Sequence, residues 1–200
     1  MDTTFPGFSV SKKLKKYCHR SSPTSELILE DCVIPAENIL GEENKGIDVL
    51  MSGLDIECAF CASESLGIAE ACLALSLKYA RERVQFGKPF GSFQLVQAKL
   101  ADMYIQIEAG RMLCYRAAIM ADAAERGGKG AEIHKLSSAS ILYNGEMAMW
   151  VADQTVKIHE GGYKLEYPVQ RFLRDAKLIE IGAETSEIMR MIISREFMGT

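Results

Sequence analysis

Three short stretches of the sequence carry side chains of the kinds that enzymes use for chemistry. The stretch SGLDIE ends in Glu57, a carboxylate that can act as a general base when a weakly acidic proton comes within hydrogen-bond reach. The stretch RERVQFG contains Arg83, whose planar guanidinium can pair with the oxygens of a diphosphate. In GAETSE, Thr185 stands where a last helix should begin, and free backbone N–H groups at a helix start favour anions.

Each of these features also has a purely structural interpretation. Glu57 can simply be solvated or paired along its own helix. Arg83 can be an arginine near the end of a helix, and Thr185 can cap its helix with or without a ligand. His134 and His159 each stand alone on, or at the end of, a predicted helix, and we expect both to be structural.

Long helices are the elements that must position these residues. Apolar residues recur at steps of three and four through most of the chain after Ile47, a period typical of amphipathic helices. Pro89 with its flanking glycines and the pair Gly161–Gly162 interrupt this period. We expect a mainly α protein whose C-terminal part is an antiparallel helical bundle. The predicted helices cover about 47–85, 92–125, 131–158, 169–177 and 185–197.

The first 45 residues are different in character. They are irregular and β-rich, with SELILEDCVIP as the best strand candidate, and they hold too few strands for a stable sheet. We therefore expect residues 1–45 to be the remnant of a β-domain and residues 46–200 to form the helical bundle domain. This beginning suggests a fragment that enters a larger protein midway.

Composition excludes few functions but gives no support to several. The chain has 200 residues, 48% of them hydrophobic, and a net charge of −4, which gives no reason to expect a nucleic-acid partner. Its basic stretch SKKLKKYCHR is most simply a solvated face. The six cysteines show no paired metal-ligand spacing, so we expect reduced thiols and no metal site. No targeting segment and no run of 18 apolar residues is visible, so we expect no membrane partner.

Three longer stretches together resemble the acyl-CoA dehydrogenase family. They are LILEDCVIPAENILGEENKG, YARERVQFGKPFGSFQLVQAKLADM and EYPVQRFLRDAKLIEIGAETSEIMR. The resemblance covers essentially the whole chain, but only about the C-terminal half of a family member. It implies the family's helical C-terminal domain, FAD as cofactor, and the removal of hydrogens from the α and β carbons of an acyl-CoA substrate.

Within the family, GFSVSKKL, DVLMSGLDIE and DAKLIEIGAETSE look most like the branch that acts on isovaleryl-CoA, in leucine catabolism. In most members the catalytic glutamate directly precedes a Gly-Thr-Ser triplet, where this chain has Ala183 followed by Glu184. In the isovaleryl branch the base lies on the first long helix, and the resemblance assigns it to Glu57. Ala183 then leaves room for a branched acyl chain, and Glu184 is rotated about 100° away. The resemblance places the substrate beside Asp55, Ile56, Cys58, Ala183 and Glu184.

The resemblance also implies where the cofactor binds. It assigns contacts with FAD, some of them across a subunit interface, to Arg83, Phe86, Gln94, Lys157, Gly161, Thr185, Ser186 and Glu187.

Two positions depart from the family pattern. Cys58 replaces an arginine that usually follows the LDxE segment. The turn KIHEGGY departs from a family pattern that begins with glutamine, has a double glycine two residues later and is one residue longer, so Lys157 and Glu160 change the charge and the backbone freedom of this turn. These departures favour an alternative, a catalytically degenerate or non-enzymatic helical assembly module of the same family.

The expected partners follow from the same resemblance and from the apolar faces of the helices. The family passes electrons to an electron-transferring flavoprotein and is found in the mitochondrial matrix. The first and second helices carry apolar or small residues on more than one face, so we expect self-association as a tetramer or dimer. The residues that suggest it are Leu66, Ala69, Leu73, Met112, Tyr115 and Ile119.

Overall fold

A computed structural model of the chain describes residues 2–125, 130–182 and 184–199, with only the backbone described at 52, 55, 124, 125, 130 and 131. It divides into two compact units, Met1–Leu54 and Asp55–Thr200, which are described separately below. The helices are α1 (Gly46–Glu82), α2 (Gln94–Glu125), α3 (Gly130–Ile158), α4 (Val169–Ile179) and α5 (Ser186–Met198). These five helices confirm the predicted mainly α fold, with ends displaced by a few residues from the expected ones.

The first unit contains little regular structure. Strands β1 (Phe8–Val10) and β2 (Leu27–Leu29) pair antiparallel, with Phe8 opposite Leu29, and a single 3-10 turn, η1 (Ala36–Asn38), precedes α1. Ile47, Leu50 and Met51 on the first turns of α1 are exposed, although they belong to the apolar pattern that predicted this helix. Two strands of three residues are too small to bury them.

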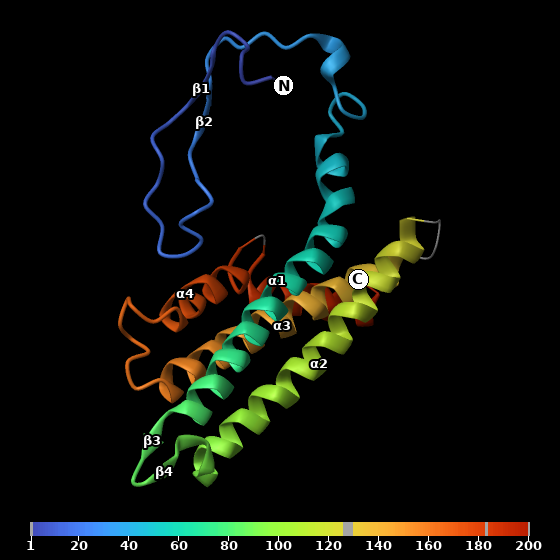
Figure 1. The fold of residues 1–200 in the computed structure, drawn as a ribbon. Helices are drawn as coiled ribbons and strands as arrows, with labels where there is room; N and C mark the ends of the chain where they lie inside the picture. The colour runs from blue at the N-terminus through green and yellow to red at the C-terminus, as the bar shows by residue number, and fades with distance from the viewer. Residues whose placement is uncertain (1, 126–129, 183, 200) are drawn as a thin grey trace. The chain divides into compact units, whose positions relative to one another are not determined.

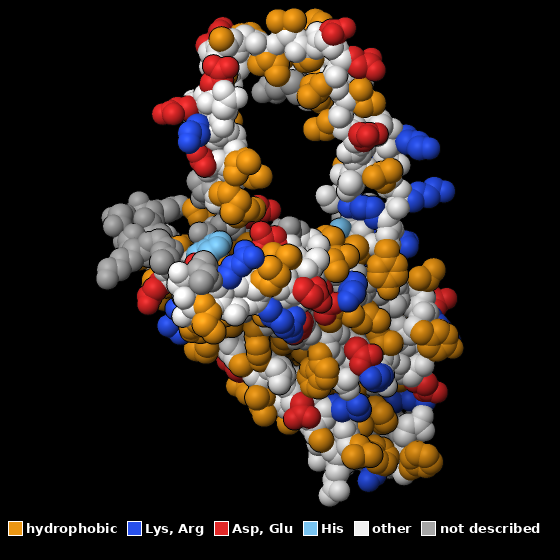
Figure 2. Space-filling view, turned by 180° about the vertical axis from the view of Figure 1, so that it is seen from behind, with side chains coloured by type: hydrophobic (Ala, Val, Ile, Leu, Met, Phe, Trp, Pro, Cys, Tyr) orange, Lys and Arg blue, Asp and Glu red, His pale blue; other side chains and the backbone are white. Residues whose placement is uncertain are grey.

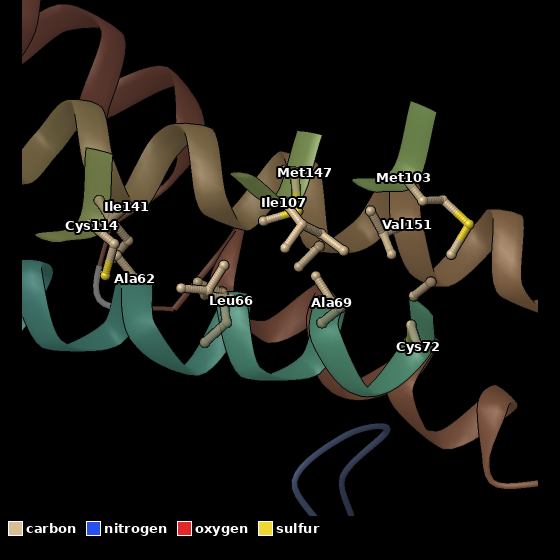
Figure 3. Packing of buried hydrophobic residues seen from close by; sticks show 14 of the residues in the cluster. Ala62, Leu66, Ala69, Cys72, Met103, Ile107, Cys114, Ile141, Met147 and Val151 are labelled. Atoms are coloured by element: carbon tan, nitrogen blue, oxygen red, sulfur yellow. The ribbon is translucent and has the colours of Figure 1, made fainter. Parts of the chain in front are cut away.

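The second unit is a bundle in which α3 packs against α2, α4 and α5 (Figure 1). Its core is built from small and medium-sized side chains at the three- and four-residue spacing of the facing helices (Figure 3). Figure 3 shows residues of α1 pointing toward α2 and α3: Ala62, Leu66, Ala69 and Cys72 facing Met103, Ile107, Cys114, Ile141, Met147 and Val151.

A close helix contact explains one glycine in this bundle. A Cβ on Gly110 would lie 2.5 Å from Oδ1 of Asn144 on α3, so only glycine allows α2 to approach this closely. The side-chain amide of Asn144 donates to the carbonyl of Gly110 at 3.2 Å and to that of Ser140 at 2.9 Å. The contact therefore fixes the register of the two helices.

A tight hairpin turns the chain from α1 to α2. Strands β3 (Val84–Gln85) and β4 (Lys88–Pro89) pair with only Phe86 and Gly87 between them, followed by the 3-10 turn η2 (Phe90–Ser92). Both loop residues have positive φ, +50° and +76°, as a type I′ hairpin turn requires. For a bulky side chain such as Phe86 this backbone conformation is unfavourable, and its ring is 91% exposed.

The helical unit leaves many apolar side chains in contact with solvent. Figure 2 shows them interspersed with acidic and basic side chains over the face in view. By length and composition alone α1 could cross a membrane, with a mean hydropathy of 1.5 over a stretch of which 44% is buried inside the structure. The core helix of a protein that is not in a membrane can have the same length and hydropathy, so this property of α1 is weak evidence for a membrane partner. It nevertheless shows that α1 contains a more apolar segment than we expected from the sequence.

Candidate functional site

An open pocket of about 410 Å³ lies where the end of α1, the β3–β4 hairpin and the end of α3 meet. It brings together three residues that the resemblance assigns to the cofactor, Arg83, Phe86 and Lys157. The other side chains at its wall are largely aromatic or apolar, with one carboxylate: Tyr79, Gln85, Phe90, Phe93, Ile158 and Glu160.

Arg83 is the principal cation of this pocket. It follows the last turn of α1, where its backbone N–H donates to the carbonyl of Tyr79 at 2.9 Å. Its guanidinium donates a hydrogen bond to the carboxylate of Glu160, which lies just beyond α3. The Nε atom of Arg83 is buried and has no hydrogen-bond partner among the residues that the structure describes. A partly unsatisfied guanidinium at a pocket wall is suited to bind an anion.

Lys157 supplies a second positive charge. It is the last basic residue of α3, it is exposed, and its Nζ lies 2.5 Å from the carboxylate of Asp153 one turn earlier. Lys88, on β4, has its ammonium 4.3 Å from the centre of the Phe93 ring. Aromatic rings and cations therefore share this end of the bundle, a combination suited to a ligand with a planar ring and a phosphate.

The turn after α3 is held firmly beneath the pocket. His159 is buried, its Nδ1 lies 2.9 Å from the carbonyl oxygen of Thr155, and burial lowers the pKa of its imidazole below the ordinary value. The hydroxyl of Tyr79 accepts a hydrogen bond from the backbone N–H of Glu160 at 3.3 Å. A Cβ on Gly161 would lie 2.5 Å from the ring of Tyr167, so this close approach requires glycine. His159 thus has the structural role that the sequence indicated.

Five of the eight residues assigned to the cofactor do not line the pocket: Gln94, Gly161, Thr185, Ser186 and Glu187. Gln94 is the first residue of α2, and its side chain is exposed. Gly161 is buried below the wall, against Tyr167.

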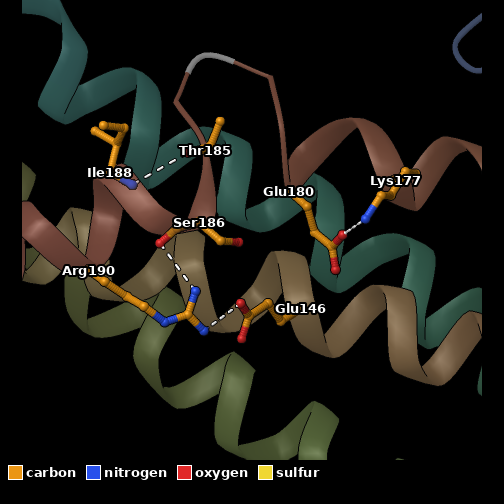
Figure 4. A network of polar contacts seen from close by, with 7 residues as sticks. All are labelled: Glu146, Lys177, Glu180, Thr185, Ser186, Ile188 and Arg190. Carbon is orange, nitrogen blue, oxygen red and sulfur yellow. Dashed lines mark hydrogen bonds and ion pairs between the residues drawn. The ribbon is translucent and has the colours of Figure 1, made fainter.

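The start of α5 forms a separate polar cluster (Figure 4). Thr185 is the N-cap, as predicted, and its hydroxyl accepts a hydrogen bond from the N–H of Ile188 at 3.4 Å. Figure 4 shows the guanidinium of Arg190 between the carbonyl of Ser186, at 3.2 Å, and the carboxylate of Glu146, at 2.6 Å. The N–H of Glu187 and the hydroxyl of Thr185 lower the pKa of the Glu187 carboxyl group. The helix start therefore holds a carboxylate in its charged form.

The residues assigned to the substrate are dispersed around α1 and the α4–α5 turn. Glu57 is exposed, and Cys58, at 6% exposure, points into the bundle core. Ile56 lines a largely apolar pocket of about 390 Å³ between α1 and α2. Glu184 is half-buried, and its N–H donates to the carbonyl of Gly182 at 2.8 Å. Ala183 and the side chain of Asp55 lie outside the described residues.

The carboxylate of Glu57 acts on a neighbouring thiol of its own helix. Burial is the main cause that raises the pKa of Cys61, and the carboxylates of Glu57 and Glu64 raise it further. None of the contacts recorded for residues 2–125, 130–182 and 184–199 joins Glu57 to the α4–α5 turn.

Sequence reasoning missed the aromatic wall of the pocket. Tyr79 precedes Arg83 by four residues, a spacing that puts both on one face of a helix, and this spacing was the available signal. The rings of Phe90 and Phe93 lie 6.0 Å apart, and the edge of Phe86 meets Phe93 at 6.2 Å. Glu160 was recognised as a departure from the family pattern, but its partner Arg83, 77 positions earlier, was not predicted.

The fold and the pocket define an antiparallel helical bundle domain with a cationic, aromatic-lined pocket at one end. Residues 44–198 match the family described as "Acyl-CoA dehydrogenase, C-terminal domain", and the chain belongs to the acyl-CoA dehydrogenase family. It is 48% identical to "Isovaleryl-CoA dehydrogenase, mitochondrial" of Oryza sativa subsp. japonica over 192 residues, which are 96% of this chain and 46% of the relative. The chain thus spans about half the length of the curated relatives it matches.

Solved structures show the same fold. Butyryl-CoA dehydrogenase from Megasphaera elsdenii superimposes with a TM-score of 0.93 at 40% identity, over 99% of this chain and 50% of that one. A chain of the structure described as electron transferring flavoprotein of Acidaminococcus fermentans superimposes with a TM-score of 0.94 at 36% identity, over 100% of this chain and 51% of that one. These likenesses span α1 to α5 and the short β segment before them.

Proposed function

We propose that this chain supplies the C-terminal helical part of an FAD-dependent dehydrogenase that acts on a short, branched acyl-CoA of the isovaleryl-CoA type. The observation that carries the proposal is the pocket of Arg83, Phe86 and Lys157, because two cations and an aromatic wall meet there. The family membership and the 48% identity to the rice relative support it.

The residues at this pocket fit a flavin dinucleotide. Arg83 and Lys157 would hold the diphosphate, and Phe86 would offer its exposed ring to a planar group. Thr185, Ser186 and Glu187 would present the start of α5, where the positive end of the helix dipole lies, to the cofactor or substrate. When bound, the flavin accepts the hydride that leaves the β-carbon of the substrate.

The chain's own contribution to the chemistry is the base. We assign this role to Glu57, whose carboxylate takes the proton from the carbon α to the thioester carbonyl. Its exposed position on α1 leaves it accessible to an acyl chain. A small residue at Ala183 would give space to a branched chain. Glu184, tied through its N–H to Gly182, would support the helix start electrostatically.

The partners and location follow from the relatives. The name of the rice relative places it in mitochondria, and we extend this location, the mitochondrial matrix, to the present chain together with a role in leucine catabolism. Electron-transferring flavoprotein is the proposed electron acceptor, supported by the likeness to a chain of such a structure. We further propose self-association as a tetramer or dimer through exposed apolar residues of α2.

A second candidate function is a helical assembly module without catalytic activity. Two observations favour it. Cys58 fills a core position where the family resemblance expects arginine, and Glu160 places a carboxylate on Arg83 within the cofactor pocket.

A chimera distinguishes the two candidates. The N-terminal half of the rice relative is joined ahead of this chain, and the visible absorbance of the purified protein is followed after addition of isovaleryl-CoA without oxygen. The rice enzyme itself is the positive control. A yellow chimera that bleaches supports the dehydrogenase, and butyryl-CoA in parallel reports on the acyl preference. A folded, yellow chimera that neither substrate bleaches supports the assembly module.

A further inference from the structure

The carboxylate of Glu160 forms an ion pair with Arg83, the residue that the proposed function assigns to the diphosphate of the cofactor. The two side chains come from different segments of the chain, Arg83 after α1 and Glu160 after α3, and they form an ion pair at the pocket wall. Their side chains are 38% and 68% exposed, so the pair lies at the pocket mouth rather than in the core. A ligand that enters the pocket must meet this carboxylate.

The guanidinium of Arg83 has N–H donors beyond the one that is paired with Glu160. A guanidinium has five N–H donors in a fixed planar fork, and the pair with Glu160 is made through Nη2. The Nε–H of Arg83 is buried and has no partner among the described residues. Full use of the fork by a diphosphate would require Glu160 to move away.

The backbone of Glu160 is fixed while its carboxylate is free to move. Its N–H donates to the hydroxyl of Tyr79 at 3.3 Å. The two following residues are glycines that the packing requires, because a Cβ on Gly161 or Gly162 would lie 2.5 Å from Tyr167 or from the carbonyl of Val156. The side chain, in contrast, is mostly exposed, and an exposed ion pair is weak enough for an anion to displace.

We infer that Glu160 is a built-in competitor for the diphosphate site of this pocket. Its carboxylate neutralises Arg83 when the pocket is empty and repels a diphosphate as it enters, so it lowers the affinity of the pocket for diphosphate-containing nucleotides. The inference rests on the proposed function for the location of the site. It goes beyond that function because it assigns the control of affinity to a residue that the family pattern does not contain.

The chemistry that would be recognised is a diphosphate linked to a nucleoside, and both FAD and coenzyme A carry one. ADP is therefore the first probe, since it contains this shared group without a flavin ring or a thiol arm. Calorimetric titration of ADP compares the wild-type chain with Glu160→Gln, which keeps the shape and removes the charge. Glu166→Gln removes an exposed carboxylate of the same connection and is the matched control.

We expect Glu160→Gln to bind ADP about tenfold more tightly than wild type, the effect of removing one close like charge at a partly exposed site. Glu166→Gln should bind as wild type does. Adding Arg83→Gln to Glu160→Gln should abolish the gain, because the released guanidinium is then absent. Far-ultraviolet circular dichroism of each variant verifies that the helices remain.

The outcomes separate this inference from the proposed function. Equal ADP affinity in wild type and Glu160→Gln, with a loss in Arg83→Gln, contradicts the competitor role and leaves the diphosphate site intact. A gain that persists without Arg83 contradicts the inferred mechanism. No ADP binding in any variant overturns both proposals. Repeating the comparison with FAD and with coenzyme A identifies the source, since a gain for coenzyme A alone would keep the competitor role but contradict the flavin assignment.

Discussion

The rings of Tyr79 and His159 stack at a centroid distance of 4.5 Å with a tilt of 34°, and they join the end of α1 to the turn after α3. Tyr79 also meets Phe90 edge to face at 6.2 Å, so one ring contacts both walls of the pocket. Because Glu160 directly follows His159 and Arg83 lies one helical turn after Tyr79, the stacking helps to set the geometry of the ion pair. The pocket is therefore a product of bundle packing rather than of a mobile loop.

His159 should make the stability of the bundle depend on pH. Burial lowers the pKa of its imidazole below 6.5, while the hydrogen bond to the carbonyl of Thr155 opposes this in part. The unfolded chain therefore takes up the proton first, and folded-state stability is lost as pH falls from about 6.5 through the lower folded pKa. We expect a slope of at most about 1.4 kcal/mol per pH unit in the free energy of unfolding.

His159→Phe tests this dependence, because it keeps a ring beside Tyr79 and cannot titrate. Urea unfolding between about pH 7.5 and about pH 5.5 should show a flatter profile for the variant than for wild type. An NMR titration of the wild-type imidazole should give a midpoint below 6.5. A midpoint at or above that value would show that burial does not control this histidine.

Phe86 should lower the free energy of unfolding through its positive φ and raise the affinity of the pocket for a ligand through its exposed ring. Phe86→Asn creates Asn-Gly, the preferred pair for a type I′ turn, and removes a bulky residue from positive φ. We expect the free energy of unfolding in urea to rise by about 0.5–1 kcal/mol, the relief of strain less the contact with Phe93. ADP binding should weaken, since the ring lines the pocket.

Phe86→Ala separates the two effects. It removes the ring but leaves a β-carbon at positive φ, so ADP binding should fall as it does in the asparagine variant while stability does not rise. If both variants bind ADP as wild type does, Phe86 belongs to the hairpin alone and its assignment to the cofactor is wrong.

The exposed apolar residues of α2 should mediate self-association. Tyr104, Met112, Tyr115 and Ile119 are all more than half exposed, and with Ile105 they fall within an arc of about 100° on the helix. From the sequence, Leu66, Ala69 and Leu73 on α1 were also expected to contribute to self-association. That suggestion is corrected by the packing, because Leu66 and Ala69 belong to the core and Leu73 packs against it.

Sedimentation equilibrium at micromolar concentration should show a dimer or tetramer for wild type. The double variant Met112→Glu, Ile119→Glu places two charges in the stripe and should shift the chain toward monomer. Ser194→Glu, at an exposed position of α5, is the control and should leave the assembly unchanged. A wild-type monomer would contradict the prediction directly.

Most of the helical fold could be predicted from the sequence, because a 3.6-residue period and strong breaks at Pro89 and Gly161–Gly162 are local signals. The cap at Thr185 was likewise local and is confirmed. The Arg83–Glu160 pair was not predictable, because the two residues are 77 positions apart in the sequence. They meet only through the register of α1 against α3, which core packing determines. The exposure of Ile47 and Leu50 was missed because periodicity identifies an apolar face but not whether anything covers it.

The identity of the base is the sharpest test of the proposed chemistry. In the chimera with the N-terminal half of the rice relative, Glu57→Gln should retain flavin and bind acyl-CoA, because the amide is nearly isosteric with the carboxylate. Flavin bleaching by isovaleryl-CoA in a stopped-flow instrument should slow by roughly 10²–10⁴-fold, the effect of removing a general base. Glu184→Gln is the matched control and should slow it far less, because its side chain belongs to the start of α5.

A rescue variant completes the test. Ala183→Glu in the Glu57→Gln background places a carboxylate directly before Glu184, where most of the family has its base. It should recover part of the bleaching rate if both positions address the same α-carbon. Wild-type bleaching by Glu57→Gln together with loss of bleaching in Glu184→Gln would show that the base is displaced by one residue in the terminal motif, and the assignment to Glu57 would be wrong.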